Sequence, residues 1–157
     1  MRLISYAMAI LLSASGLTAQ DLSDIVVHRP QIAASIGSAK AGAGYVSIEN
    51  KGAVTVKLLA AEADFPRVMI HNTVFEDGLA KMVHLHEGIE IPAGETLHLE
   101  QGGMHIMFMG IGMPFRTGDT IPTDLIFESI GKLEVEFDVV PREEIGGGIM
   151  DVGHDHD

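Results

Sequence analysis

Short segments in which apolar and polar residues alternate recur along this chain, and they constrain its fold more than any other feature. EVEFDVV at 134–140 places three apolar side chains on one face and three acidic side chains on the other, because successive side chains of a strand point to opposite faces. GYVSIEN at 44–50 and AVTVKLLAAEA at 53–63 alternate in the same way, and turn sequences such as Asn-Lys-Gly and Pro-Ala-Gly separate such segments. The pattern predicts an all-β sandwich or barrel without a long helix.

The alternation extends over one segment, which we expect to form a single domain at residues 20–141. Inside it, QIAASIGSAKAGA at 31–43 consists of small and polar residues and predicts a loop or a brief helical turn. After residue 141 the alternation is lost and three consecutive glycines appear. Residues 142–157 are therefore expected to be a flexible tail.

Residues 1–19 have the three parts of a secretory signal peptide: Arg2, an apolar run over 3–12, and small residues up to Ala19. The alternative is a membrane anchor, but the run is shorter than the roughly 20 residues of a spanning helix. We expect export to the periplasm, cleavage within a residue or two of Ala19, and no membrane insertion afterwards. The chain contains no Cys, so the residue that carries the lipid in a bacterial lipobox is missing.

Charge and cysteine content exclude several classes of function. The formal net charge is −12, from 22 acidic and 10 basic residues. Such a chain repels nucleic acid and anionic membrane surfaces, and it favours cationic partners. Without Cys, disulfides, thiolate catalysis, zinc–thiolate sites and Cys-ligated copper sites are all excluded. A soft metal bound here must therefore take its sulfur from Met.

The segment GGMHIMFMG at 102–110 concentrates methionine around one histidine. In a strand, His105, Met107 and Met109 share one face, whereas the side chains between them face the other way. The His-x-Met pair then presents an imidazole nitrogen beside a thioether sulfur, a combination that suits Cu(I). Two ligands do not complete a site, so further donors must come from elsewhere in the chain.

The best candidates for these donors lie in VMIHNTVFEDGLAKMVHLHEG at 68–88, where Glu-Asp-Gly at 76–78 reads as a turn between two strands. A hairpin there brings His71 near Met82 and gives a candidate set of two nitrogens and two sulfurs. Methionine is also a common filler of cores, and a single strand histidine is more often exposed or hydrogen-bonded than a ligand. These simpler interpretations remain open for the four donors. They are favoured for the other residues of both types: His28, Met69, His98, Met104 and Met109.

The run H71-x10-M82-x22-H105-x-M107, together with IPAGETLHLEQGGMHIMFMG at 91–110, resembles the PCu(A)C family of periplasmic copper chaperones over residues 24–141. Two details differ from the family pattern: the second spacing is 22 rather than 21, and Ala80 stands where the family usually has a further Met. Neither difference removes a donor.

The resemblance implies a cupredoxin-like β-sandwich with Greek-key topology and a Cu(I) site near its surface. It implies that the copper ligands are His71, Met82, His105 and Met107. It also implies delivery of copper to an acceptor, in particular subunit II of cytochrome c oxidase, by a protein that is not an enzyme. We expect this protein to be a monomer.

Two further histidine clusters are candidates for secondary sites. Met150, His154 and His156 stand among aspartates after the glycines, and nitrogen with carboxylate donors suits Cu(II); the alternative is an exposed polar tail. His84 and His86 could form a weak site or modulate the first one, or they could be ordinary exposed strand residues.

Two other functions remain open at this point. One is copper sequestration, or copper tolerance, without a delivery partner. The other is a copper-dependent thiol or metal reductase, against which the absence of Cys argues.

Overall fold

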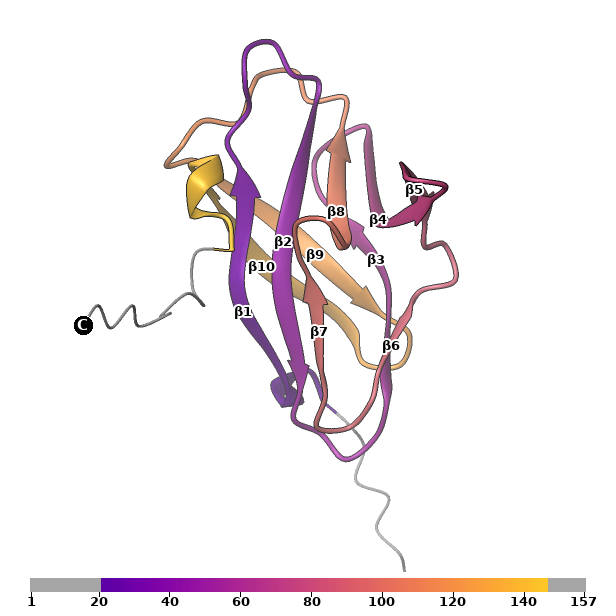
Figure 1. Ribbon diagram of the computed structural model, residues 1–157. Helices are drawn as coiled ribbons and strands as arrows, with labels where there is room; N and C mark the ends of the chain where they lie inside the picture. Colours follow the sequence, from indigo (N-terminus) through magenta and orange to yellow (C-terminus); the bar gives the residue numbers. More distant parts are fainter. Residues whose placement is uncertain (1–20, 147–157) are drawn as a thin grey trace, which may run out of the picture.

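The computed structural model of the protein describes residues 21–146 and is almost entirely β-structure (Figure 1). Two short 3-10 helices, η1 (Leu22–Asp24) and η2 (Arg142–Glu144), flank the strands. No helix in this part of the chain is long and apolar enough to cross a membrane. The ten strands are β1 (Ile25–Ala33), β2 (Ala41–Asn50), β3 (Val56–Glu62), β4 (Arg67–Glu76), β5 (Leu79–His84), β6 (Ile89–Ile91), β7 (Thr96–Leu99), β8 (Met104–Met109), β9 (Thr120–Phe127) and β10 (Gly131–Val140).

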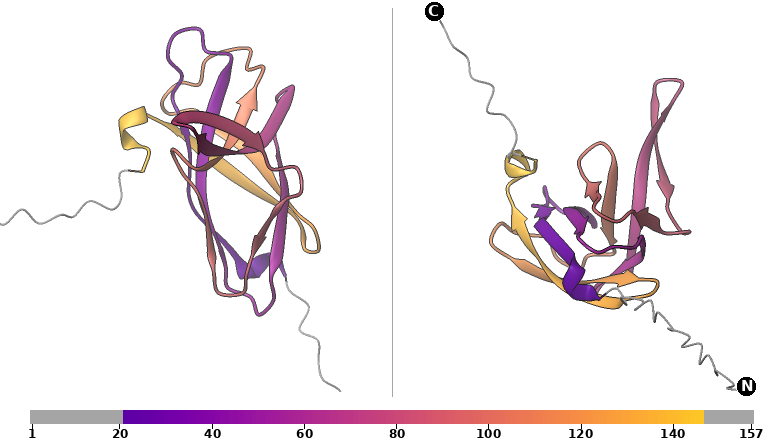
Figure 2. Two further views of the ribbon diagram at one scale, coloured as in Figure 1. Left: turned by 45° about the vertical axis from the view of Figure 1, so that its right-hand side comes forward. Right: turned by 90° about the horizontal axis from the view of Figure 1, so that it is seen from below.

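The strands form one hydrogen-bonded path in the order β5-β4-β8-β2-β1-β10-β9-β3-β6, and β7 also pairs with β2. The path folds over itself, so that β1, β2, β7 and β8 lie in front of β9 and β10 (Figures 1 and 2). The short pairing of β1 with β10 is parallel and connects the two layers, whereas the other pairings in the described chain are antiparallel. The all-β sandwich expected from the alternation is therefore confirmed.

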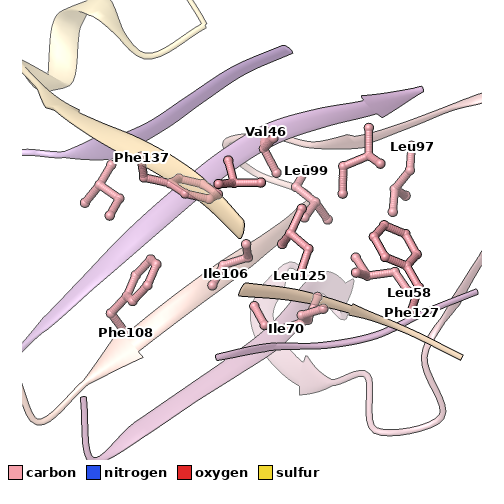
Figure 3. Packing of buried hydrophobic residues seen from close by; sticks show 14 of the residues in the cluster. Val46, Leu58, Ile70, Leu97, Leu99, Ile106, Phe108, Leu125, Phe127 and Phe137 are labelled. Carbon is pink, nitrogen blue, oxygen red and sulfur yellow. The ribbon is translucent and has the colours of Figure 1, made fainter. Parts of the chain in front are cut away.

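Apolar side chains from both layers meet in one core (Figure 3). On β10 the residues Val135, Phe137 and Val139 are buried and the acidic residues between them are exposed, as the sequence predicts. Phe108 of β8 makes edge-to-face contacts with three other rings, at centroid distances of 5.7 to 6.3 Å from Phe65, Phe115 and Phe137. This aromatic packing holds the middle of β8 against the core.

The small-residue segment 31–43 forms the expected loop at its centre, whereas its two ends belong to strands. β1 continues to Ala33 and β2 begins at Ala41, so only 34–40 connects them. The glycines near the start of β2 have a packing role. A Cβ atom on Gly42 would lie 2.4 Å from the ring of Phe115, and one on Gly44 would lie 2.8 Å from the ring of Phe108. Glycine is needed at these positions because aromatic rings cross directly over the backbone of β2.

A two-residue turn joins β4 to β5 as the sequence predicts. Asp77 and Gly78 have φ angles of 51° and 78°. Positive φ at both central residues is the requirement of a type I′ turn, which Asp-Gly satisfies well. The turn sets the register of the whole hairpin, with Glu76 opposite Leu79.

We predict that Gly42→Ala destabilises the protein by about 1–3 kcal/mol, because the added methyl group collides with the buried ring of Phe115. Chemical denaturation followed by circular dichroism measures this loss. Gly112→Ala is the matched control, since a Cβ atom there meets nothing within 4 Å, and its effect should stay below about 0.5 kcal/mol. Equal effects of the two substitutions would contradict the packing role of Gly42.

Candidate metal-binding face

Strand β8 separates core residues from potential metal ligands. Ile106 and Phe108 are fully buried and point into the core (Figure 3). His105 and Met107 alternate with them and therefore share the opposite face. Met104 packs against the core cluster, which confirms the packing role expected for it. The same alternation that anchors the strand thus presents an imidazole beside a thioether.

The pairing of β4 with β8 places His71 directly opposite His105. Their ring centroids are 5.9 Å apart, with an angle of 81° between the ring planes. Two residues further along, Met69 lies opposite Met107. Directly opposed residues on neighbouring strands point to the same side of the sheet, so His71 and His105 lie beside each other on the face that also carries Met107.

The pairing of β4 with β5 adds two more donors to this face. His84 lies directly opposite His71, with ring centroids 5.9 Å apart. Met82 lies opposite Thr73 and is 61% exposed, so it adjoins His71 diagonally rather than directly. We refer to the surface of β5, β4 and β8 formed by Met82, His84, His71, His105 and Met107 as the donor face. The three strands lie side by side in Figure 1.

The ring of His105 is oriented by a backbone carbonyl. Its Nδ1 atom lies 3.1 Å from the carbonyl oxygen of Gly103. A carbonyl can only accept, so Nδ1 must carry the proton and Nε2 keeps a lone pair. His105 is only 5% exposed, so it has little freedom to turn. Histidine ligands of metals are commonly oriented by a hydrogen bond of this kind.

His71 is the member of the donor face whose hydrogen bonding is incomplete. Its Nδ1 atom is buried and has no hydrogen-bond partner in the described chain. Burial lowers the pKa of His71, and the neighbouring His105 and His84 lower it further. The lowered pKa of His71 favours the neutral form, and a neutral imidazole can donate a lone pair to a metal. A buried nitrogen without a partner is costly, and a bound cation would satisfy it.

The donor face fits copper better than harder metals. In residues 21–146 no three His, Asp or Glu side chains converge on one point that could hold an ion. A site on this face consequently needs thioether sulfur in addition to imidazole nitrogen. That mixed donor set favours Cu(I) over Mg²⁺, Ca²⁺ or Mn²⁺.

The remaining histidines fall outside the donor face or outside the described residues. His28 contacts Glu49, with 2.8 Å between Nε2 and Oε2, and His98 Nδ1 lies 2.9 Å from the hydroxyl oxygen of Ser47, which confirms their expected structural role. His86 follows β5, with its ring centroid 6.0 Å from that of His84. The expected signal peptide at 1–19 and the candidate tail residues Met150, His154 and His156 lie outside the described residues.

Reasoning from the sequence missed the direct pairing of His84 with His71. The signal was present: a two-residue turn at Asp77-Gly78 pairs Glu76 with Leu79, and counting outward from that pair brings 71 opposite 84. The sequence predicts His84 as part of a weak site, as a modulator of the first site or as an exposed strand residue, because the His and Met spacing favours Met82 as the neighbour of His71.

A family model described as "Putative lipoprotein LpqE-like" matches residues 25–139. A curated "Putative lipoprotein" of Leifsonia xyli subsp. xyli (strain CTCB07) is 36% identical over 86 residues, which are 54% of this chain and 52% of that protein. The chain thus spans about half the length of this curated relative.

Solved structures share the fold. The apo form of DR1885 from Deinococcus radiodurans has a TM-score of 0.61 at 28% identity, covering 92% of this chain and 96% of that one. Its Cu(I) form has a TM-score of 0.57 at 26% identity, covering 82% and 84%. A copper-bound PCuAC domain from PmoF2 has a TM-score of 0.61 at 19% identity, covering 75% and 93%. The resemblance to PCu(A)C domains and their cupredoxin-like sandwich is confirmed.

We predict that His84→Gln raises the pKa of His71 in the metal-free protein, because it removes a neighbouring charge that opposes protonation. The midpoint should remain below the ordinary value of about 6.5, since burial is the main cause. Titration of the ring protons by NMR measures both effects. His98→Gln, which lies off the donor face, should leave the midpoint of His71 unchanged; an equal shift there would contradict the proposed contact.

The lowered pKa of His71 also predicts how folding stability depends on pH. The unfolded chain binds a proton at His71 at higher pH than the folded chain does, so folding stability falls as the pH drops below about 6.5. Replacing His71 by Gln should flatten this part of the stability profile, which urea denaturation between pH 5 and 7.5 measures.

Proposed function

The chain belongs to the LpqE-like family, and from this membership and the donor face we propose that it is an exported carrier of Cu(I). The copper ion is its cargo, and the ligands are His71, Met82, His105 and Met107. Export depends on the signal peptide expected at 1–19. The family description refers to lipoproteins, but these 157 residues contain no Cys, and the proposal does not involve a lipid.

One observation supports the proposal more strongly than the others do. His71 and His105 lie directly opposite each other on neighbouring strands, and Met107 shares their face. The lone pair of His105 Nε2 is left free by the hydrogen bond of its Nδ1 to Gly103. Met82 is exposed, and the three rotatable bonds of a methionine side chain allow its sulfur to approach His71 from the diagonal position.

The ligand chemistry suits a carrier in an oxidising compartment. Thioethers cannot form disulfides, so a Met-based site survives where a dithiol would be oxidised. All four ligands are neutral when they bind, so no ligand anion must be protonated for copper to leave. An acceptor with stronger thiolate ligands can then take the ion by ligand exchange.

A carrier also accounts better for the donor face than an enzyme does. Its donors are imidazoles and thioethers, and the sequence has no Cys for thiol exchange. The acidic chain favours an acceptor with a basic surface. Following the family resemblance, we propose subunit II of cytochrome c oxidase as an acceptor. The tail residues Met150, His154 and His156 are a proposed secondary Cu(II) site.

Removing one ligand should weaken Cu(I) binding at least about tenfold, because even residues that only orient a metal ligand cost about 10–100-fold. We expect this loss for Met82→Leu and Met107→Leu, which keep side-chain volume, and for His105→Gln. Competition with a chromophoric Cu(I) chelator under reducing conditions measures the affinity.

Two substitutions away from the donor face serve as controls. Met113→Leu removes an exposed thioether and His98→Gln removes a hydrogen-bonded imidazole, and both should bind Cu(I) like the unsubstituted protein. Circular dichroism establishes that each variant is folded. Unchanged affinity in all three ligand variants would refute the site, whichever function the protein has.

Delivery and sequestration predict different phenotypes in a strain that lacks this protein. If the protein delivers copper, the oxidase copper centre should fail to assemble at limiting copper and recover when copper is added. The measurement is the optical or EPR signal of that centre in isolated membranes. Normal assembly together with greater copper sensitivity would contradict delivery and support sequestration.

A further inference from the structure

The donor face carries the same two donor types on both sides of β4. On β8, His105 is followed two residues later by Met107, and on β5, Met82 is followed two residues later by His84. His71 on the central strand pairs directly with both histidines, at centroid distances of 5.9 Å in each case. We name His71, His105 and Met107 the inner triad, and His71, Met82 and His84 the outer triad.

His84 and His105 cannot bind the same ion at the same time. His84 and His105 lie on opposite sides of His71, two strand spacings apart, which is roughly 10 Å between their backbones. No three imidazole or carboxylate side chains in residues 21–146 converge on one point. His71 can therefore share an ion with His105 or with His84, and a thioether completes either arrangement.

The triads differ in their access to solvent. His105 is buried, and Met107 is half-buried beside it. Every residue of β5 is exposed, and β5 lies at the end of the strand order, with β4 as its neighbour. An ion in the inner triad is thus shielded, whereas an ion in the outer triad lies on the edge strand, where a second protein can reach it.

We propose that His84 is a further copper ligand and that the outer triad is a second Cu(I) position, used in alternation with the inner one. The proposal rests on the proposed function and assigns a direction to it: the inner triad retains the ion and the outer triad presents it. His71 and Met82 bind the ion in both positions, so the inner triad acts together with Met82.

The exchange between the positions needs no other reactant. The copper–nitrogen bond to His105 breaks as the bond to His84 forms, and Met107 leaves the ion while Met82 stays bound. Copper stays in the Cu(I) state throughout, and no proton is transferred because both imidazoles bind in the neutral form. The inner position offers two nitrogens and two sulfurs and the outer position two nitrogens and one sulfur, so both offer the ion the same ligand types.

The test is a double-substitution cycle on Cu(I) affinity in the full chain. His84→Gln alone should weaken binding less than about threefold, because the inner triad still holds the ion. In a chain that carries His105→Gln, the outer triad is the remaining position. There His84→Gln should weaken binding at least about tenfold. Competition with bicinchoninate, a chromophoric Cu(I) chelator, measures all four affinities.

Two further variants keep the result interpretable. Met107→Leu replaces His105→Gln as the inner-triad change if the latter does not fold, since a Met-to-Leu exchange conserves volume. His86→Gln is the matched control: it removes the next imidazole along the chain and should have no effect in either background. Copper held by the tail would not depend on His84.

Each outcome supports or overturns the inference. A His84→Gln effect that is the same in both backgrounds overturns the alternation, and so does the binding of two Cu(I) ions at once on the donor face. An equal effect of His86→Gln overturns the assignment to His84. If the unsubstituted chain binds Cu(I) no better than the doubly substituted chain, the proposed function itself fails, which is a different result.

Discussion

The pairing of β4 with β8 is the interaction on which the rest of this structure depends. Ile70 and Ile106 face each other across it on the core side, and His71 and His105 face each other on the outer side. A slip of one residue would exchange the two faces of a strand, placing an imidazole in the core and an isoleucine outside. The hydrophobic effect therefore enforces the register, and the opposition of the two histidines follows from it at no separate cost.

The strength of that register comes from packing elsewhere in the sandwich. Phe108 packs edge-to-face against the rings of Phe65, Phe115 and Phe137. Its ring also crosses the backbone of β2 at Gly44. β8 is consequently held both by its neighbours in the sheet and by the opposite layer. Strand β5 has no such support within residues 21–146, because it pairs there only with β4 and all of its residues are exposed. Rigid and exposed donors thus stand on either side of His71.

Much of this arrangement could be predicted from the sequence, and the parts that could not have physical reasons. Period-two alternation predicted the strands, and Asp77-Gly78 predicted the hairpin, since both are local signals. Gly42 looked like part of a loop because the ring that requires glycine there, that of Phe115, comes from a residue more than seventy positions away. Asn50 looked like an ordinary turn residue. It is fully buried, and its side-chain amide donates to the carbonyl of Ile91 at 2.9 Å, a contact between distant segments that no local pattern reveals.

The electrostatics of the donor face complement its geometry. Burial and the two neighbouring histidines lower the pKa of His71, which disfavours a positive charge on the central ligand before copper arrives. A protonated imidazole there would repel Cu(I) and would also lack a lone pair to bind it. The bound ion then adds its positive charge to a chain whose formal net charge is −12. The cost of placing that charge in a half-buried position is offset over long range by the acidic protein and locally by the unpartnered nitrogen of His71. Toward β5 the same ion becomes accessible to solvent, so the free-energy cost of desolvating it decreases along the path by which it would leave.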